Sequence, residues 1–384
     1  MKVAVPKERR EHERRVAATP YTAKKFSDLG AHVVVEHDAG LQSNFVDQLY
    51  RDAGAEIADS EVETLSGADV VLKVQSPITG NEGDADELDM IQEGAVLVGL
   101  LAPFDQRSKI DEYAEHGIRA FAMELIPRIT RAQSMDALSS QSNLAGYRAV
   151  LDAAAEFHRA LPMMMTAAGT VAPARVFVLG AGVAGLQAIA TARRLGAIVS
   201  ATDVRLIAKE QVESLGASFV MVEDKESASA ETEGGYAKEM SEDYQHKQAE
   251  LVRAHIAHQD IVVATALIPG HPAPTLIDDD MVLSMSSGSV IVDLAVEAGG
   301  NCTLSRPGEI VQVNGVKVIA FRNVPSRVAE DASALYARNL FNFLMPLIDA
   351  ETHCLKIDWN DEIVAGTALT RDGAVVHPLL ANRG

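Results

Sequence analysis

The feature that most constrains this chain is a glycine-rich turn that joins a short apolar run to a helical segment. Residues 176–179 form the apolar run, and Gly180, Gly182 and Gly185 follow it in the spacing G-x-G-x-x-G. Residues 186–195 are rich in Ala, Leu, Gln and Arg, which favour a helix. A buried strand, a tight turn and a helix in this order predict one βαβ unit of a parallel sheet.

The glycine spacing also has a chemical meaning. The first glycine permits a tight turn, the second lets a pyrophosphate approach the backbone, and the third lets the helix lie close to the strand. The N-terminus of that helix offers N–H groups and a positive dipole to phosphates. The spacing thus predicts a dinucleotide site; the alternative is a plain βαβ unit whose glycines only ease packing.

An acidic residue supports the dinucleotide interpretation. A second apolar run, residues 197–201, is followed by Asp203, where a carboxylate can bond the adenosine ribose. This carboxylate would accept a 2′-hydroxyl and repel a 2′-phosphate, which favours NAD over NADP. Arg205 points the other way, because arginine can hold a 2′-phosphate, but the strand-end position of Asp203 faces the ribose more directly.

Apolar runs alternate with helical segments along most of the chain. This alternation predicts an α/β fold with two Rossmann-like, doubly wound parallel-sheet domains, of which the first lacks the glycine motif. The strands predicted for the first domain are residues 2–5, 32–36, 70–74, 95–100 and 118–123. Those predicted for the second are residues 176–179, 197–201, 218–222, 261–266, 289–294 and 316–320.

The two domains are expected to share the chain unequally. We predict a first domain of residues 1–140 completed by residues 325–384, and a nucleotide-binding domain of residues 141–324. Two long helices, predicted at 143–161 and 329–347, would join the domains and leave a cleft between them. The carboxyl ends of parallel strands form the ligand crevice in such sheets, so the site is expected there.

Several other segments carry simpler interpretations. Residues 223–242 have few apolar anchors and predict a mobile surface loop. Residues 358–377 resemble short hairpins, and the methionine run 163–165 is interpreted as core filling. His255 and His258 are expected on a solvated helix face. Structural roles are expected for three polar groups, namely Asp293 near the end of the predicted strand 289–294, and Glu297 and Asn301 after it.

Composition excludes several classes of protein. The formal net charge is −20, which disfavours direct contact with nucleic acid or anionic lipid. Cys302 and Cys354 match no zinc spacing and form no disulfide framework, so no metal is expected. The N-terminal apolar run is too short for a signal peptide, and no run of 18 apolar residues is present to span a membrane.

A polar segment at residues 127–142 precedes the first of the two predicted connecting helices. It crowds basic, amide, acidic and hydroxyl groups together, among them Arg128, Gln133, Asp136 and Ser139. These groups could bond a carboxamide or a ribose, which makes the segment a candidate site. The alternatives are a solvated Arg128–Asp136 ion pair in a linker and a plain surface amide at Gln133.

At these motifs the chain resembles the NAD(H)-binding component of the alpha subunit of proton-translocating nicotinamide nucleotide transhydrogenases, in its separately encoded form. The polar segment carries more of this resemblance than the glycine motif does. The matching stretches begin at Pro6, Arg128, Ser139, Met163, Gly180, Gly234, Thr265 and Asp293. More distantly, the chain resembles alanine dehydrogenases, which share the two-domain architecture.

The resemblance implies an activity and a set of partners. Members of the family transfer hydride directly between NAD(H) on this component and NADP(H) on the beta subunit, with AB stereospecificity, and only together with their partner subunits. A membrane-spanning subunit couples the reaction to proton translocation. The resemblance therefore implies a homodimer that is cytoplasmic and peripheral on the inner face of the cell membrane, held there by partner subunits.

The resemblance also assigns residues. Arg128, Gln133, Asp136 and Ser139 would line the nicotinamide end, with Gln133 reaching toward the nucleotide of the partner. Tyr236 would close over the site, or else is a tyrosine that packs on a helix. The other residues implied to bind the cofactor are Ile129, Thr130, Arg131, Gly180, Gly182, Val183, Gly185, Asp203, Val204, Arg205, Gly235, Gln248 and Leu267.

Two rival functions remain open from the sequence. An alanine-dehydrogenase-like enzyme would need a base and an anchor for a carboxylate, and Arg15 and Lys73 stand where that family binds its substrate. The catalytic histidine of that family is missing, because the corresponding strand offers only Leu100 or Leu101. Arg15 and Lys73 are therefore interpreted as structural remnants. The third possibility is a non-catalytic module that senses NAD and controls a partner.

Overall fold

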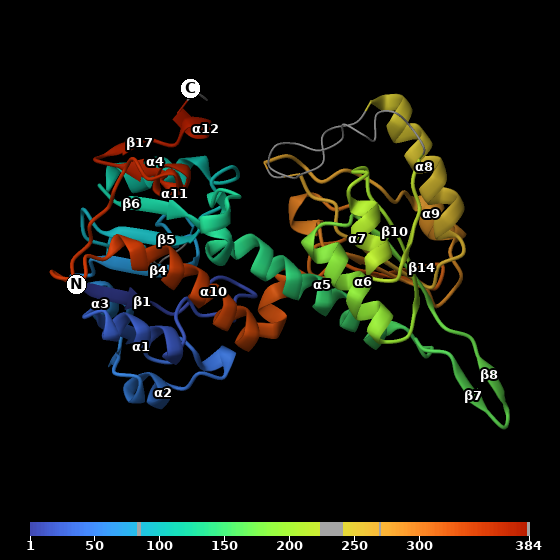
Figure 1. Cartoon of the computed structure of the whole chain (residues 1–384), viewed down its shortest axis with the longest axis horizontal. Helices are drawn as coiled ribbons and strands as arrows, with labels where there is room; N and C mark the ends of the chain where they lie inside the picture. The colour runs from blue at the N-terminus through green and yellow to red at the C-terminus, as the bar shows by residue number, and fades with distance from the viewer. Residues whose placement is uncertain (83–85, 223–240, 269, 382–384) are drawn as a thin grey trace. The chain divides into compact units, whose positions relative to one another are not determined.

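The computed structural model describes residues 1–82, 86–222, 241–268 and 270–381. The chain divides into two compact units. Unit 1 contains Met1–Gln141 and Ser326–Gly384, and unit 2 contains Ser142–Pro325 (Figure 1). The long helix α5 (Ala137–Glu156) begins in unit 1 and ends in unit 2. The predicted pair of connecting helices and the cleft between domains stay predictions.

Unit 1 is built on a parallel sheet of six strands in the order β3-β2-β1-β4-β5-β6. The strands are β1 (Lys2–Val5), β2 (His32–Glu36), β3 (Glu56–Ala58), β4 (Val70–Gln75), β5 (Val96–Leu100) and β6 (Arg119–Ala122). The helices are α1 (Pro20–Asp28), α2 (Asp47–Asp52), α3 (Glu61–Leu65), α4 (Arg107–Glu115), α10 (Ala329–Leu344), α11 (Glu362–Thr367) and α12 (Pro378–Ala381). The parallel sheet is confirmed, with β3 as a strand that the sequence did not reveal.

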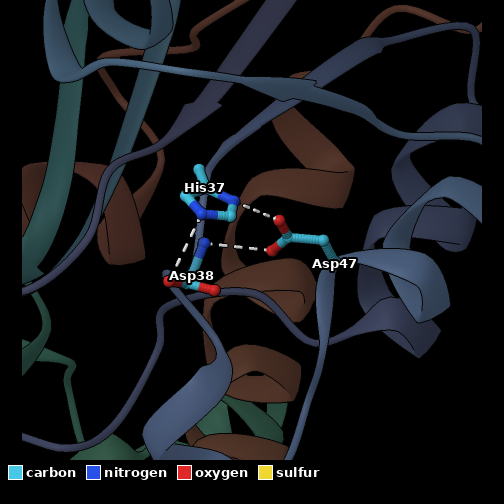
Figure 2. Close-up of side chains that lie close together, drawn as sticks. All are labelled: His37, Asp38 and Asp47. Carbon is cyan, nitrogen blue, oxygen red and sulfur yellow. Dashed lines mark hydrogen bonds and ion pairs between the residues drawn. The ribbon is translucent and has the colours of Figure 1, made fainter.

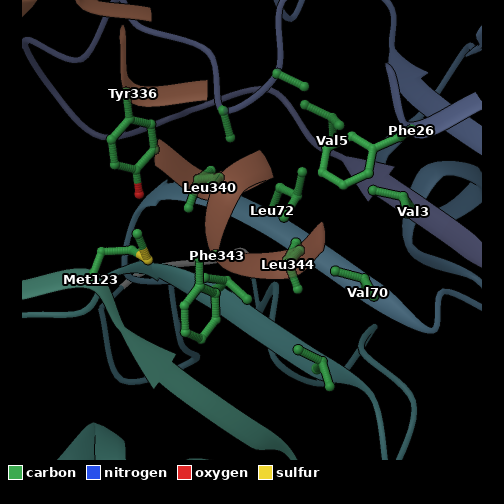
Figure 3. Packing of buried hydrophobic residues seen from close by; sticks show 14 of the residues in the cluster. Val3, Val5, Phe26, Val70, Leu72, Met123, Tyr336, Leu340, Phe343 and Leu344 are labelled. Atoms are coloured by element: carbon green, nitrogen blue, oxygen red, sulfur yellow. The ribbon is translucent and has the colours of Figure 1, made fainter. Parts of the chain in front are cut away.

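Both faces of this sheet are buried, because side chains alternate along each strand. Val3 and Val5 of β1 belong to one apolar cluster, and Ala4 belongs to another on the opposite face. Helix α10 covers the first face, where Leu340 and Phe343 pack among the valines of β1 and β4 (Figure 3). A C-terminal helix thus completes the core of the N-terminal unit.

The C-terminal segment corrects one expectation. Residues 358–377 contain one hairpin, formed by β16 (Thr370–Arg371) and β17 (Ala374–Val375), around a turn at Asp372 and Gly373. The rest of the predicted hairpin region includes helix α11 instead, whose N-cap Asp361 accepts hydrogen bonds from two backbone N–H groups. The cap outweighs the mediocre helix propensity of Thr367 and Gly366 within that helix.

Unit 2 is built on a sheet of seven strands in the order β11-β10-β9-β12-β13-β15-β14. The strands are β9 (Arg175–Leu179), β10 (Ile198–Thr202), β11 (Ser218–Phe219), β12 (Ile261–Ala264), β13 (Val290–Asp293), β14 (Ile310–Val313) and β15 (Val316–Ile319). The helices are α6 (Val183–Arg194), α7 (Ala208–Ser214), α8 (Glu242–Ile256) and α9 (Asp279–Ser284). Strand β14 pairs antiparallel with β15, and the other six strands repeat the Rossmann order of unit 1.

The methionine run was misinterpreted as core. Met163, Met164 and Met165 are 59%, 43% and 77% exposed. Met164 and Met165 lie in β7 (Met164–Thr166), which pairs with β8 (Gly169–Val171) in a separate two-stranded sheet. This hairpin extends away from the seven-stranded sheet of its own unit (Figure 1). Apolar composition alone could not show that these residues stay exposed.

Helix α8 corrects the expectation for His255. The ring of His255 meets Phe177 edge-on at 4.5 Å between centroids, and its Nε2 lies 2.8 Å from Ser200 Oγ. Burial lowers the pKa of His255 below its usual value. His258 is exposed, as expected, but lies in the turn after α8 and not on a helix. Of the helices that the described residues form, none combines the length and apolar character needed to cross a bilayer.

Candidate functional site

The glycine turn has the geometry of a nucleotide-binding turn. Gly180, directly after β9, has φ of +97°, which strongly favours glycine. A Cβ on Gly185 would lie 1.9 Å from the carbonyl oxygen of Gly180, so only glycine lets α6 pack this closely on the turn. A Cβ on Gly182 would meet nothing within 4 Å. The backbone at Gly182 is therefore open to a ligand, at the N-cap of α6.

The two charged residues after β10 form one ion pair. Arg205 Nε and Nη2 donate to Asp203 Oδ1 at 2.9 Å and Oδ2 at 2.8 Å. The backbone N–H of Ala181, inside the glycine turn, also donates to Asp203 Oδ2 at 2.8 Å. Asp203 therefore ties the end of β10 to the turn. Because Arg205 partly neutralises this carboxylate, the preference for NAD over NADP stays a prediction.

The other predicted cofactor residues of unit 2 differ in how exposed they are. Val183 is the first residue of α6 and is exposed, as is Leu267 after β12. Gln248 is half-buried on α8. Val204 packs against Tyr244, which is buried on α8 and was missed from the sequence. Gly235 and Tyr236, with the predicted mobile loop, lie outside the described residues.

Polar groups in and after β12 and β13 hold the neighbouring loops, and one of them bonds the glycine turn. Thr265 Oγ1 donates to the carbonyl of Gly180 at 3.0 Å. Buried Asn301 binds Ala266 through both ends of its side-chain amide, with Oδ1 accepting at 3.0 Å and Nδ2 donating at 2.9 Å. Asp293 accepts from the backbone of Asn301 at 2.9 Å, and Glu297 accepts from that of Asn323 at 3.0 Å. The structural roles expected for Asp293, Glu297 and Asn301 are confirmed.

The second group of predicted residues lies in unit 1, on the 3₁₀ helix η3 (Thr130–Met135) and its flanks. Ala132 and Met135 are buried in the core, whereas Arg131 and Gln133 are exposed on the other face. Arg128, Ile129 and Thr130 lead into η3, and Arg128 and Thr130 are exposed. One face of this segment is thus fixed in the core and the other offers polar groups to solvent.

Asp136 and Ser139 begin helix α5 together. Asp136 Oδ1 accepts the backbone N–H of Ser139 at 2.9 Å, and Asp136 Oδ2 accepts the Ser139 hydroxyl at 2.5 Å. This is an N-terminal capping arrangement, and it starts the helix at Ala137, six residues before the predicted start. Arg131 Nη1 donates to Asp361, the N-cap of α11, at 2.6 Å. Hydrogen bonds thus hold the segment near the start of η3, at Arg131, and directly after its end, at Asp136.

Comparison with known proteins now places the chain. Residues 4–145 match the family description "Alanine dehydrogenase/PNT, N-terminal domain", and residues 149–378 match "Alanine dehydrogenase/PNT, C-terminal domain". The chain is 58% identical over 384 residues to an NAD(P) transhydrogenase subunit alpha of Rhodospirillum rubrum, with both chains fully covered. The chain belongs to the NAD(P) transhydrogenase alpha-subunit family.

Solved structures agree with this family. A transhydrogenase from Sinorhizobium meliloti matches with a TM-score of 0.88 and 51% identity, covering 98% of this chain and all of the other. An L-alanine dehydrogenase matches with a TM-score of 0.82 and 25% identity, covering 99% and 98%. The resemblance to transhydrogenases is confirmed, and the architecture is shared with alanine dehydrogenases.

The two cations that an alanine dehydrogenase would use are paired inside unit 1 of this chain. Arg15 Nε and Nη2 donate to Glu13 at 2.8 and 2.7 Å, and Arg15 Nη1 donates to Gln141 at 2.8 Å. Lys73 Nζ lies 2.8 Å from Glu87 and 3.4 Å from Glu8. Internal glutamates thus pair with both cations.

The pKa values of Glu8 and Glu13 are shifted in opposite directions. Burial, only partly offset by the charge of Lys73, raises the pKa of Glu8 to about 7. Burial also acts on Glu13, but the charge and hydrogen bonds of Arg15 outweigh it and lower the pKa of Glu13 to about 2. Glu13 therefore forms a firm pair with Arg15, whereas Glu8 can take up a proton near neutral pH.

Unit 1 also shows why its Rossmann-like sheet lacks a nucleotide turn. Glu36 at the end of β2 accepts the backbone N–H of Lys7 at 2.8 Å and pairs with Arg9 at 2.5 Å. This repeats the pattern of Asp203, Ala181 and Arg205 in unit 2. The loop after β1 carries Glu8 instead of glycines, and the Glu8 side chain reaches the N–H of Val74 at 2.6 Å. The protein's own side chains thus occupy this end of the sheet.

One group of possible metal ligands occurs among the described residues, formed by His37, Asp38 and Asp47. His37 Nδ1 lies 2.6 Å from Asp47 Oδ2, and the Asp38 N–H donates to Asp47 Oδ1 at 3.0 Å (Figure 2). The hydrogen bond to Asp47 and the charge of Asp38 raise the pKa of His37. These contacts explain the group as a hydrogen-bonded turn before α2.

Proposed function

We propose that this protein is the NAD(H)-binding component of a proton-translocating transhydrogenase. NAD(H) would bind at the glycine turn of unit 2, preferentially to NADP(H). Hydride would pass directly to or from NADP(H) on a beta-subunit domain, with AB stereospecificity. A membrane-spanning subunit would couple the transfer to proton movement and hold the protein at the inner face of the membrane. The names of the closely similar relatives support the partnership with other subunits.

The chemistry of hydride transfer fits the polar groups around η3. Transfer between two nicotinamides moves no proton to or from an alcohol or amine, so it needs no general acid or base. It needs the two rings close together, aligned and shielded from water. In this proposal Arg128, Asp136 and Ser139 orient the nicotinamide end, and exposed Gln133 reaches toward the partner. Positioning groups of this kind are what the segment supplies.

One observation favours transhydrogenation over amino-acid oxidation. Arg15 and Lys73 are neutralised by Glu13, Glu8 and Glu87, so both cations are already paired within the protein. Buried Leu101 stands near the place of the missing histidine. The alternative of an alanine-dehydrogenase-like oxidoreductase would need an anchor at the first two positions and a base at the third, and these side chains supply neither.

The proposal is tested by mixing the protein with an NADP(H)-binding partner domain and following reduction of an NADP analogue by NADH. We expect transfer with the wild type, and a rate about 10- to 100-fold lower for Gln133→Ala because the rings are less well aligned. The affinity for NADH, measured by calorimetry, should stay within about twofold, since Gln133 contributes to alignment and little to binding.

Ser134→Ala, at the neighbouring exposed side chain, is the matched control and should transfer hydride at the wild-type rate. A large loss of NADH affinity with unchanged turnover in Gln133→Ala would place this residue elsewhere. Reduction of NAD by L-alanine would support the alanine dehydrogenase alternative, and NADH binding without any transfer would support a sensing module.

We also propose that the protein is a homodimer, and the exposed hairpin supports this. Met164 and Met165 on β7, Met163 directly before it and Val171 on β8 present apolar surface. Methionine is flexible and polarisable, which suits a surface that packs against another chain. The composition of the whole chain showed no such surface.

The double variant Met164→Lys/Met165→Lys should therefore shift the protein from dimer to monomer. We expect the molar mass measured by light scattering to fall from about twice the chain mass to the chain mass of 41.0 kDa, because lysines would be buried unpaired in the interface. Leu283→Lys, on the exposed face of α9, is the control and should leave the mass unchanged. A dimer that survives the double variant would exclude the hairpin as the interface.

A further inference from the structure

The backbone beside Gln133 is held by two asparagines of α10. The carbonyl oxygen of Ser134 accepts Asn339 Nδ2 at 2.9 Å and Asn342 Nδ2 at 3.0 Å. A 3₁₀ helix such as η3 has poorer internal hydrogen-bond geometry than an α-helix, so ties from outside matter more for its position. The two amides supply such ties at the residue that follows Gln133.

Asn339 makes two hydrogen bonds through its side-chain amide, whereas one is found for Asn342 among the described residues. The side chain of Asn339 is buried, and both ends of its amide are used, because the Ser140 hydroxyl donates to Asn339 Oδ1 at 2.8 Å. Ser140 lies in the first turn of α5, four residues after Asp136. Asn342 is exposed at its amide, where water competes with the bond to Ser134. Asn339 therefore joins η3 and the start of α5 to one point on α10.

These hydrogen bonds connect through Gln141 to the buried Arg15–Glu13 ion pair of unit 1. Gln141 Nε2 donates to Ser140 Oγ at 3.2 Å and to the carbonyl of Ala332 on α10 at 3.1 Å. Gln141 Oε1 in turn accepts from Arg15 Nη1. Gln141, which contacts Ser140, is thus itself bonded to α10 and to Arg15. With Asn339 in place, these bonds restrict the movement of the backbone between Gln133 and Ser140.

We propose that Asn339 is a positioning residue for hydride transfer. By fixing the carbonyl of Ser134 and the hydroxyl of Ser140, it sets the backbone from which Gln133, Asp136 and Ser139 project. This inference rests on the proposed function. Asn339 holds Ser134 and Ser140 in unit 1, and no contact with the coenzyme is proposed for it. Its loss should therefore lower the rate of transfer and leave binding at the glycine turn of unit 2 intact.

Asn339→Asp tests this, because aspartate can still accept from Ser140 but cannot donate to Ser134. We expect the rate of transfer to the partner-bound NADP analogue to fall about 10- to 100-fold, since small displacements of aligned groups cost rates of this size. The dissociation constant for NADH should stay within about twofold of wild type. Ser140→Ala removes the hydroxyl that contacts Asn339, Gln141 and the Ala137 carbonyl, and Asn342→Asp removes the second donor to Ser134. Each should lower the rate less than Asn339→Asp does, because the bond from Asn339 to Ser134 remains. If Asn339→Asp does not fold, the uncharged Asn339→Ala replaces it, with the same expectation.

Two results would overturn the positioning role. One is a wild-type rate in Asn339→Asp or Asn339→Ala. The other is a parallel loss of rate, NADH affinity and melting temperature that Ser140→Ala shares, which would mean a purely structural contribution. A wild-type protein that binds NADH but transfers no hydride gives a different result, since it defeats the proposed function itself and the positioning role with it.

Discussion

Replacing Gly185 with alanine is expected to abolish useful binding of NADH. The new Cβ would lie 1.9 Å from the carbonyl oxygen of Gly180, whereas real Cβ atoms essentially never approach closer than 3.0 Å. The turn must therefore shift by about 1 Å or separate from α6, and both changes remove the backbone that would hold the pyrophosphate. We expect the affinity for NADH, measured by calorimetry, to fall at least about 100-fold, or about 2.7 kcal/mol.

Gly182→Ala is the matched control, since a Cβ there meets nothing within 4 Å. It should leave the melting temperature unchanged and still weaken NADH binding, because the methyl group would occupy the space of the ligand. Gly185→Ala should lose stability as well, by about 1–3 kcal/mol as in other overpacked sites. Wild-type affinity in Gly182→Ala would show that the nucleotide does not approach this turn.

Lys73→Met is expected to be the most destabilising single change in unit 1. Lys73 is 2% exposed and pairs with Glu87 and Glu8, so its loss leaves buried Glu8 without its paired cation and Glu87 with Arg9 alone, at 4.0 Å. Breaking a buried pair in this way costs about 3–5 kcal/mol. Urea unfolding can be followed by fluorescence of Trp359, the single tryptophan, which stacks on Phe121 at 5.8 Å in the core of unit 1.

The stability lost in Lys73→Met should increase with pH. The pKa of Glu8 is raised from 4.5 to about 7 in the folded wild type, so Glu8 destabilises the fold progressively as pH rises through that range. Without Lys73 the charged form is still less favourable. We therefore expect a larger loss at pH 8 than at pH 5.5, and a smaller pH dependence in Lys73→Met/Glu8→Gln.

Lys24→Met controls for the loss of a surface charge. Lys24 pairs with Asp28 one helical turn away at 3.1 Å, and both side chains are exposed. Such pairs contribute about 0.3–0.5 kcal/mol, so this variant should unfold almost as the wild type does at both pH values. An equal loss for Lys73→Met at pH 5.5 and pH 8 would contradict the account of Glu8.

The sequence was most informative where a local pattern has one physical solution. The glycine spacing after residues 176–179 predicted a turn that only glycine can form, and Gly180 and Gly185 confirm this in their φ angle and packing. Alternating apolar runs and helical segments likewise predicted two parallel sheets, because strands buried on both faces must be apolar throughout. Neither inference required knowledge of contacts between distant residues.

Other features depended on which distant residues meet. Arg15 and Lys73 were interpreted as structural remnants of a substrate site, but the sequence did not show their partners; the fold places glutamates against both. The methionine run had core composition, but its side chains are exposed on a hairpin. The roles of the cofactor residues, including Gly235 and Tyr236 beyond the described residues, stay predictions of the family resemblance.

By itself, the sequence determined the parallel α/β architecture and the glycine turn, because each follows from local patterns of residue types along the chain. Only the tertiary structure decided the pairing of the buried charges, the exposure of the hairpin and the tie from Asn339 to Ser134, which are 205 residues apart. The physical reason is that hydrogen bonds and ion pairs act over about 3 Å, so distant groups interact only where the folded chain brings them together.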